Sequence, residues 1–308
     1  MSIARSLLLK AANSPWLADQ MSKRAFSRRA IRKFMPGEEL EDALGAAGTL
    51  QGQGIGSLFT RLGEGLTKMA DAEAVRDHYL GVFDQLKARN IKTWISVKPT
   101  QLGLDLSQPK CLEYLDQLAA KAVATGSSLW IDMEDSSYVD RTLDLYRALK
   151  AKYEPIGIAI QSYLFRTPAD IESLLPLKPW IRLVKGAYAE PATIAFPVKR
   201  DNDLAYYDLS LKMLDGVKKY GGLAVFGTHD IELLHRIVGA AKERGVKPGQ
   251  YEIHMLYGIK TAEQHAFVAR GETVKVLISY GHAWFKWYMR RLAERPANVW
   301  FVVKTMVA

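Results

Sequence analysis

Two adjacent arginines near the C-terminus, Arg290 and Arg291, are the first residues whose type and spacing indicate chemistry. They belong to a predicted helix from Ala283 to Arg295, which Pro296 ends. Neighbouring side chains on a helix point about 100° apart, so such a pair normally faces solvent. Both guanidinium groups can bind one small anion only if the helix lies across the mouth of a pocket. Their paired donors suit a carboxylate.

Polar side chains also follow each of eight short apolar segments. A single polar residue at a strand end is usually structural, because strands exit into water, but eight together predict a rim on which chemistry is done. In chain order they are Glu64, Lys98, Asp132 with Glu134, Gln161, Lys185, Thr228 with His229, His254 and Tyr280.

Among these residues, Lys185 and the histidines allow more than one chemical interpretation. A lysine at a strand end could form a Schiff base, as in an aldolase-type lyase, or serve as a cation for phosphate or carboxylate, and the sequence leaves both open. His229 and His254 lack the helical or finger spacing of a metal site, so we expect them to be hydrogen-bonded. We therefore expect no metal ion.

The segments that carry these residues alternate between two patterns. Between the apolar runs lie amphipathic segments such as residues 111–126, with apolar residues at i, i+3 and i+4 and a terminating Gly126. Eight strands, each followed by a helix, predict an α/β fold with a parallel (βα)8 barrel. We place the strands at Gly54–Leu62, Thr93–Thr100, Ser128–Glu134, Ile156–Ser162, Trp180–Gly186, Leu223–Asp230, Tyr251–Tyr257 and Thr273–Gly281.

Gly52, Gly54 and Gly56 give only a weak match to a dinucleotide-binding fingerprint. The third glycine comes one residue early, and Ser57 stands where the motif requires glycine. A Rossmann domain is therefore not predicted.

Length and composition are those of a large globular protein. The 308 residues are 48% hydrophobic and 24% charged, which excludes global disorder. The net charge of +9 predicts contact with an anionic partner, but does not choose among nucleic acid, lipid and an acidic metabolite. The single cysteine, Cys111, excludes an intramolecular disulfide and favours a reducing compartment.

Residues 1–48 are expected to form a helical arm and residues 49–308 the barrel. Many Lys and Arg residues precede Lys33, and the run from Phe34 to Gly37 ends the helical pattern. We favour a basic face packed on the barrel over a lipid-binding surface helix. Because no stretch approaches the roughly 18 apolar residues of a membrane span, we expect a cytoplasmic protein, with at most peripheral contact to the inner face of a membrane.

Seven sequence segments between about Leu58 and the C-terminus resemble the proline dehydrogenase family of the short monofunctional bacterial type. They are WISVKPTQLGLDLS, IDMEDS, IQSYLFRT, IRLVKGAY, FGTHD, HMLYGIK and YGHAWFKWYMRRLAERPAN. The resemblance implies a distorted barrel that binds FAD without a Rossmann domain, with the last helix over the barrel mouth. It also implies oxidation of L-proline to Δ1-pyrroline-5-carboxylate and transfer of electrons to a membrane quinone.

The same resemblance implies roles for the residues at matching positions. Lys98, Arg290 and Arg291 would hold the substrate carboxylate, and Asp132 would lie near the substrate amine. Tyr188 and Leu256 would wall the substrate ring, while Glu64 matches the acid that pairs with the first arginine as a gate. Arg182 would lie close to flavin N5. The flavin contacts would be Gln161, Arg182, Lys185, Gly186, Ala187, Thr228 and His229.

Three positions depart from the family pattern around one pocket. His254 stands where the family has a flavin-facing glutamine, Leu277 replaces a tyrosine of the last strand, and Trp287 replaces a second tyrosine before the arginine pair. Losing two hydroxyl groups makes this wall more apolar, and an indole is bulkier. A different cyclic amine, or a bulkier or N-substituted proline, is therefore an alternative substrate.

Two other functions are disfavoured by the sequence. A Schiff-base lyase on Lys185 is the weaker enzyme class, because Arg182 and His229 accompany that lysine. Helix-turn-helix, zinc-finger and RNA-binding signatures are missing from the sequence, so we expect no nucleic-acid partner. The positive charge instead fits contact with an anionic membrane, where a quinone acceptor is found.

Overall fold

The computed structural model describes residues 31–63, 66–285 and 287–289. Eight parallel strands close into a barrel in sequence order, so the predicted (βα)8 architecture is confirmed. Each strand is one to four residues shorter than predicted. The strands are β1 (Gly56–Arg61), β2 (Thr93–Val97), β3 (Leu129–Ile131), β4 (Ile156–Gln161), β5 (Trp180–Val184), β6 (Leu223–Gly227), β7 (Tyr251–Leu256) and β8 (Val274–Tyr280).

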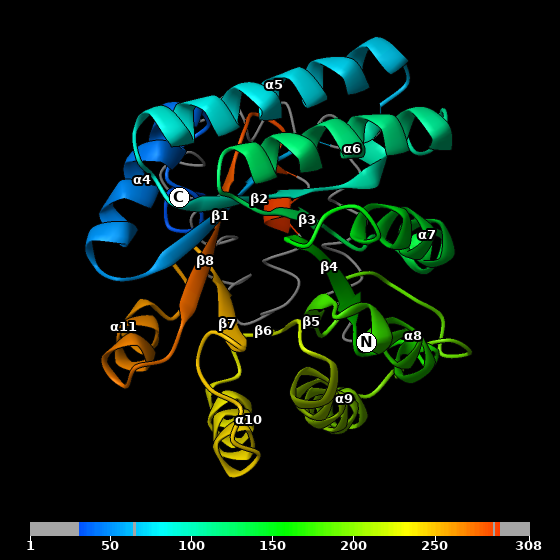
Figure 1. Cartoon of the computed structure of the whole chain (residues 1–308), viewed down its shortest axis with the longest axis vertical. Helices are drawn as coiled ribbons and strands as arrows, with labels where there is room; N and C mark the ends of the chain where they lie inside the picture. The colour runs from blue at the N-terminus through cyan, green and yellow to red at the C-terminus, as the bar shows by residue number, and fades with distance from the viewer. Residues whose placement is uncertain (1–30, 64–65, 286, 290–308) are drawn as a thin grey trace, which may run out of the picture.

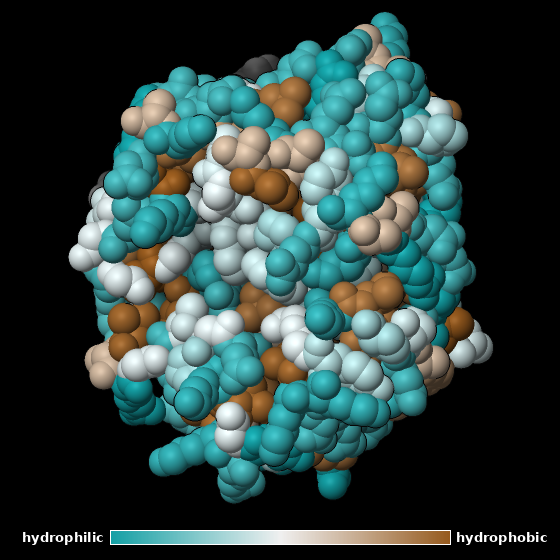
Figure 2. Space-filling view, in the orientation of Figure 1, coloured by the Kyte–Doolittle hydropathy of each residue, from teal (hydrophilic) through white to brown (hydrophobic). Residues whose placement is uncertain are grey.

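Helices surround the ring of strands, as Figure 1 shows. Hydrophilic residues cover most of this outer layer on the face seen in Figure 2, with hydrophobic residues in small groups between them. The α-helices are α4 (Leu40–Gly52), α5 (Met69–Ala88), α6 (Gln108–Ala124), α7 (Val139–Lys150), α8 (Thr167–Leu174), α9 (Lys199–Tyr220), α10 (Ile231–Glu243) and α11 (Thr261–Ala269). Three 3-10 helices are η1 (Pro99–Leu102), η2 (Ser136–Tyr138) and η3 (Leu175–Leu177).

Alternation along the strands separates two hydrophobic regions. In β2, Ile95 and Val97 belong to the large core between strands and helices, whereas Trp94 packs with the cluster inside the barrel. Successive side chains of a strand point to opposite faces, so Ser96 is expected to face inward with Trp94. Every second residue of each strand is therefore available to line the barrel interior.

The strand register sorts these inward side chains into levels, each built from four alternate strands. We call Leu58, Trp130, Arg182 and His254 the central level; these residues come from β1, β3, β5 and β7. Above it, toward the carboxyl ends of the strands, lies the small level: Ser96, Ala159, Gly227 and Leu277. The level below the central one is Trp94, Gly157, Val225 and Lys275.

Three indole rings fill the lower part of the barrel. The ring centroid of Trp94 lies 5.7 Å from that of Trp130 and 5.5 Å from that of Trp180. Trp130 and Trp180 are 6.4 Å apart. Aromatic rings at these separations attract one another beyond the area that they bury, so the interior at this height is a packed core.

Helix α4 precedes the barrel and lies against β1 and β8. The predicted boundary between residues 48 and 49 falls inside this helix. Gly54 has φ +75° in the turn that leads from α4 into β1. A Rossmann fingerprint instead leads from a strand into a helix, so this glycine cluster has a different structural role.

The segment just before α4 packs against the segment that follows β8. Glu38 accepts hydrogen bonds from Trp284 Nε1 (2.9 Å) and pairs with His282 Nδ1 (2.8 Å). Ile31 and Met35 share a small hydrophobic cluster with Trp284. This part of the expected arm packs on the barrel; residues 1–30 lie outside the described residues. Among the described helices, none has the length and apolar character needed to cross a membrane.

Candidate functional site

An arginine–aspartate pair lies inside the barrel near the carboxyl ends of β2, β3 and β5. Arg182 Nη2 forms an ion pair with Asp132 Oδ1 and donates a hydrogen bond of 3.0 Å to Ser96 Oγ. Ser96 Oγ in turn donates to Asp132 Oδ1 at 2.8 Å. Three strands thus hold two of the predicted site residues, Arg182 and Asp132, in direct contact.

Burial makes this pair electrostatically strong. Arg182 is 5% exposed, and its guanidinium group lies 5.2 Å from the ring centroid of Trp130. Burial lowers the pKa of Arg182, and the charge of Asp132 opposes this change. A buried cation needs such a partner, because an unpaired charge in a protein interior is costly.

Short side chains lie directly above Arg182. The small level contains Ser96, Ala159 and Gly227, and a Cβ atom at Gly227 would lie only 2.9 Å from Val184 Cγ1 and 3.3 Å from Arg182 Cγ. Arg182 Nη1 and Gln161 Oε1 are buried and have no hydrogen-bond partner among the described residues. Small side chains next to unpaired polar atoms suit a flat polar group such as the predicted isoalloxazine ring.

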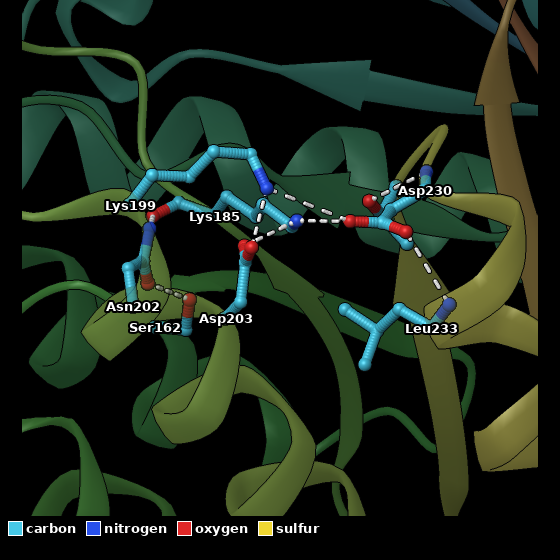
Figure 3. Close-up of polar contacts among 8 residues, drawn as sticks. Ser162, Lys185, Lys199, Asn202, Asp203, Asp230 and Leu233 are labelled. Carbon is cyan, nitrogen blue, oxygen red and sulfur yellow. Dashed lines mark hydrogen bonds and ion pairs between the residues drawn. The ribbon is translucent and has the colours of Figure 1, made fainter.

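Lys185 follows β5 and is held between two carboxylates (Figure 3). Its Nζ lies 2.6 Å from Asp203 Oδ1 and 2.8 Å from Asp230 Oδ2. Lys199 pairs with the same two aspartates, with 3.8 Å between its Nζ and Asp230 Oδ2. A Schiff-base lysine must present a free amine to a carbonyl. These ion pairs therefore disfavour the lyase and favour a fixed cation.

The N-terminal turn of α9 also fixes the backbone of this lysine. Asn202 Nδ2 donates to the backbone oxygen of Lys185 at 3.0 Å, and Asn202 Oδ1 accepts from Ser162 Oγ at 2.6 Å (Figure 3). Burial raises the pKa of Asp230, but the hydrogen bond and charge of Lys185 outweigh it, and the pKa is lowered. The carboxylate is therefore ionised at neutral pH.

His229 and Thr228 connect the ends of β6 and β7. The backbone N–H of Leu256 donates to His229 Nε2 at 2.9 Å, so this nitrogen carries no proton and the ring is neutral. Thr228 Oγ1 accepts from the backbone N–H of Asp230 at 3.2 Å. Both predicted flavin contacts thus have a fixed orientation at the rim.

Gly186 begins the loop between β5 and α9 in a conformation that requires glycine. Its φ is +102°, and a Cβ atom would lie 2.5 Å from the Tyr163 ring. Further along the loop, Glu190 accepts hydrogen bonds of 2.7 Å from Ser136 N and Oγ. The loop that contains Ala187 and Tyr188 is thereby tied to the segment that follows Asp132.

The substrate side of the predicted site is only partly described. Lys98 follows β2 two residues beyond Ser96, and Leu256 and Leu277 lie on the inward faces of β7 and β8. Trp287 is 8% exposed and packs in the cluster of Ile31 and Met35. Glu64, Arg290 and Arg291 lie outside the described residues, so the gate and the three-cation clamp stay predictions.

Two residues that were predicted at the rim of the barrel, Tyr280 and His254, do not lie there. Tyr280 points outward, where its hydroxyl is 2.7 Å from His78 Nε2, because the inward position at this end of β8 belongs to Ser279. His254 lies in the central level, 4% exposed, below the rim. Its ring is 5.6 Å from that of Trp130 and 6.1 Å from that of Trp94.

Sequence reasoning missed several polar partners. Ser96 is two residues before Lys98 and therefore shares its face of β2, which was an available signal. Asp203 follows Lys199 at i+4 spacing, which normally indicates an exposed helical pair. In the described part of the chain, no group of three or more His, Cys, Asp and Glu side chains is arranged to hold a metal ion.

Comparison with known proteins gives concordant matches. A family model described as proline dehydrogenase matches residues 43–304. Proline dehydrogenase 1 of Bacillus subtilis (strain 168) is 36% identical over 279 residues, covering 90% of this chain and 91% of that protein. The proline dehydrogenase of Deinococcus radiodurans is 33% identical over 308 residues, covering 98% of this chain and 97% of that protein.

A solved structure has the same fold. Proline utilization A from Bdellovibrio bacteriovorus superimposes with a TM-score of 0.78 at 21% identity, covering 89% of this chain. The matched region is 32% of that longer chain. The chain therefore spans about a third of that protein, and the likeness concerns the barrel.

Proposed function

The chain belongs to the proline dehydrogenase family, and from this premise we propose that it is an FAD-dependent enzyme. It oxidises L-proline, or a close cyclic amino acid, to Δ1-pyrroline-5-carboxylate or the corresponding imine. The observation that carries this proposal is the buried contact of Arg182 with Asp132 and Ser96, beneath a level of short side chains.

The residues present fit a flavin. When bound, FAD would supply a ring that accepts two electrons in the form of a hydride. Arg182 offers an Nη1 donor and Gln161 a carbonyl oxygen, neither of which has a partner among the described residues, and Lys185 offers a fixed cation. Fixed cations near a ring that gains negative charge stabilise that charge without reorganising. Gly186, Ala187, Thr228 and His229 complete the proposed set of cofactor contacts, whereas His254 lies below the rim and does not belong to it.

Asp132 and Lys98 would act on the substrate. Asp132 Oδ1 already accepts from Ser96 and pairs with Arg182, so its carboxylate is fixed where a substrate amine would bind. Lys98 would hold the substrate carboxylate together with Arg290 and Arg291. Such clamps hold the reacting carbon at a fixed position, and the amine must lose its proton before hydride leaves the adjacent carbon.

The substrate wall would be apolar. Leu256, Leu277 and Trp287 line it with Tyr188, so an N-methyl or larger ring would be tolerated better than in a pocket lined by hydroxyl groups. This makes an N-substituted or bulkier proline analogue the alternative substrate.

Anaerobic spectroscopy tests the activity. We expect purified protein to be yellow, with absorption bands at about 380 and 450 nm, and L-proline to bleach the longer-wavelength band. Hydroxyproline, pipecolate and N-methylproline form the comparison panel. Bleaching by a different panel member would replace proline as substrate, and a colourless protein that cannot be loaded with FAD would contradict the cofactor.

We further propose that a membrane quinone accepts the electrons and that the protein contacts anionic lipid peripherally. The net charge of +9 supports this. Co-sedimentation with phosphatidylserine vesicles should occur at low salt and weaken as salt rises, whereas neutral phosphatidylcholine vesicles serve as the control. Equal binding to both vesicle types would contradict an electrostatic contact.

A further inference from the structure

A buried chain of polar groups lies in the barrel beneath Arg182. Lys275 Nζ is 2.5 Å from Glu252 Oε1, and Glu252 Oε2 is 3.0 Å from His254 Nε2. The side chains of Lys275, Glu252 and His254 are 13%, 7% and 3% exposed. Replacing such a buried pair by apolar residues of similar volume is often neutral or stabilising. A role other than stability is therefore worth seeking.

The hydrogen bond to Glu252 determines the tautomer of His254. An ionised carboxylate only accepts hydrogen bonds, so Nε2 of His254 carries the proton that it donates to Glu252. Burial lowers the pKa of His254 to about 4, so the ring is neutral at pH 7. Nδ1 then carries a lone pair that can accept a hydrogen bond, and it has no partner among the described residues.

Three polar groups of the central level are buried and lack partners among the described residues. They are His254 Nδ1, Arg182 Nη1 and Trp130 Nε1. The first is an acceptor and the other two are donors. Both His254 and Arg182 lie against the Trp130 ring, at 5.6 and 5.2 Å. A single water molecule has the complementary set, since it accepts two hydrogen bonds and donates to an acceptor.

We propose that His254 is a positioning residue for Arg182, acting through one buried water that accepts from one N–H of Arg182 Nη1 and from Trp130 Nε1 and donates to His254 Nδ1. The second N–H of Nη1 stays available to the proposed flavin. Lys275 and Glu252 keep Nδ1 unprotonated. Arg182 is thereby held on two sides: Nη2 by Asp132 and Ser96, and Nη1 by the water. The consequence for a flavin rests on the proposed function, whereas the hydrogen-bond arrangement does not.

Imidazole ¹⁵N spectroscopy tests the arrangement directly. In the wild-type protein at pH 7, His254 should be the neutral Nε2–H tautomer, with its signal assigned by loss in the His254→Gln variant. The Glu252→Leu/Lys275→Leu double variant should fold with unchanged or higher stability but show a mixture of tautomers. An Nδ1–H tautomer in the wild type, or an unmixed Nε2–H tautomer in the double variant, would overturn the proposal.

Crystallography of the purified protein tests the water. A density peak within hydrogen-bond distance of Arg182 Nη1, Trp130 Nε1 and His254 Nδ1 is expected. No such peak, or a direct contact between Arg182 and His254, would refute the bridging role.

Two substitutions at residue 254 separate positioning from packing. Glutamine offers a carbonyl acceptor and an N–H donor, whereas leucine offers neither. In flavin-loaded protein, His254→Leu should make the flavin midpoint potential more negative and slow reduction by proline about tenfold with unchanged KM. His254→Gln should match the wild type within about twofold. Equal effects of both variants would overturn the proposal. If the protein binds no flavin, the proposed function fails, and the tautomer measurement still decides the arrangement.

Discussion

At the scale of single residues, the Arg182–Asp132 pair combines burial with the proposed catalytic position of Asp132. Arg182 cannot lose its charge, and a side chain that is 5% exposed has little access to water. Breaking a buried pair costs far more than breaking a surface pair, because one uncompensated charge is left inside.

We therefore predict that Asp132→Ala lowers the free energy of unfolding by about 3 kcal/mol and abolishes flavin bleaching by proline. The matched control is Asp140→Ala, which removes the carboxylate of the Arg166–Asp140 pair; Asp140 has a side chain that is 79% exposed. That change should cost less than about 1 kcal/mol. Chemical denaturation of both variants measures the difference, and equal losses would contradict the assignment of a buried pair.

The sequence identified residues of this site but not their contacts. Asp132, Arg182 and Lys185 were predicted from strand ends and family motifs, and the structure places Asp132 against Arg182. Their partners Ser96 and Asp203 were missed, because each contact joins segments that are far apart in the chain. Glu252 and Lys275 resembled ordinary strand residues, since one sequence cannot show which strands become neighbours.

At the scale of elements, Gly157 in β4 allows Trp130 of β3 to fit inside the barrel. A Cβ atom at Gly157 would lie 2.3 Å from Trp130 Cδ2, and Trp130 is fully buried. The indole therefore crosses the neighbouring strand at the position where no side chain stands.

Gly157→Ala should therefore destabilise the protein, by about 1–3 kcal/mol, because the indole has no free volume into which it can move. Gly81→Ala is the opposite control: Gly81 lies in α5 with nothing within 4 Å of its Cβ position, and alanine should stabilise by about 0.5–1 kcal/mol. Thermal unfolding of the two variants should shift in opposite directions. A neutral Gly157→Ala would show that Trp130 is not confined.

Element types were predictable and element ends were not. All eight strands were found from their apolar runs, but β3 has only three residues, Leu129–Ile131, where seven were expected. Asp132 to Glu134 continue the alternating pattern beyond Ile131, the last residue of β3 that is paired with neighbouring strands, so the pattern alone extends the strand too far. The division predicted between residues 48 and 49 lies inside α4, which continues to Gly52.

At the scale of the whole molecule, the buried His254 and the half-buried His78 make stability depend on pH. Burial lowers the pKa of His254 to about 4, against the opposing effect of the hydrogen bond that His254 donates to Glu252. Burial and the charge of Arg61 lower the pKa of His78 to about 4 as well. Unfolded chains bind protons at these histidines near pH 6.5, so between pH 6.5 and 4 the unfolded state binds more protons than the folded state.

The contribution of these two histidines to the free energy of unfolding should therefore be complete above pH 6.5. It should fall on acidification by about 1.4 kcal/mol per pH unit for each histidine. Chemical denaturation at pH 7, 6 and 5 measures this slope, above the range in which the lowered pKa values of Glu252 and Asp230 matter. His254→Gln should remove about half of the slope, whereas His265→Gln, at an exposed position, should not change it. A pH-independent wild type would contradict both shifts.

The three indoles of the barrel interior also have an optical consequence. Trp94, Trp130 and Trp180 come from three different strands, yet their centroids are 5.5 to 6.4 Å apart. Electronic transitions in rings this close couple, and the coupling gives circular dichroism in the near ultraviolet. An opened barrel that kept its helices would lose this band and retain the far-ultraviolet signal. Closure of the sheet can thus be followed by light absorption alone, without any added label.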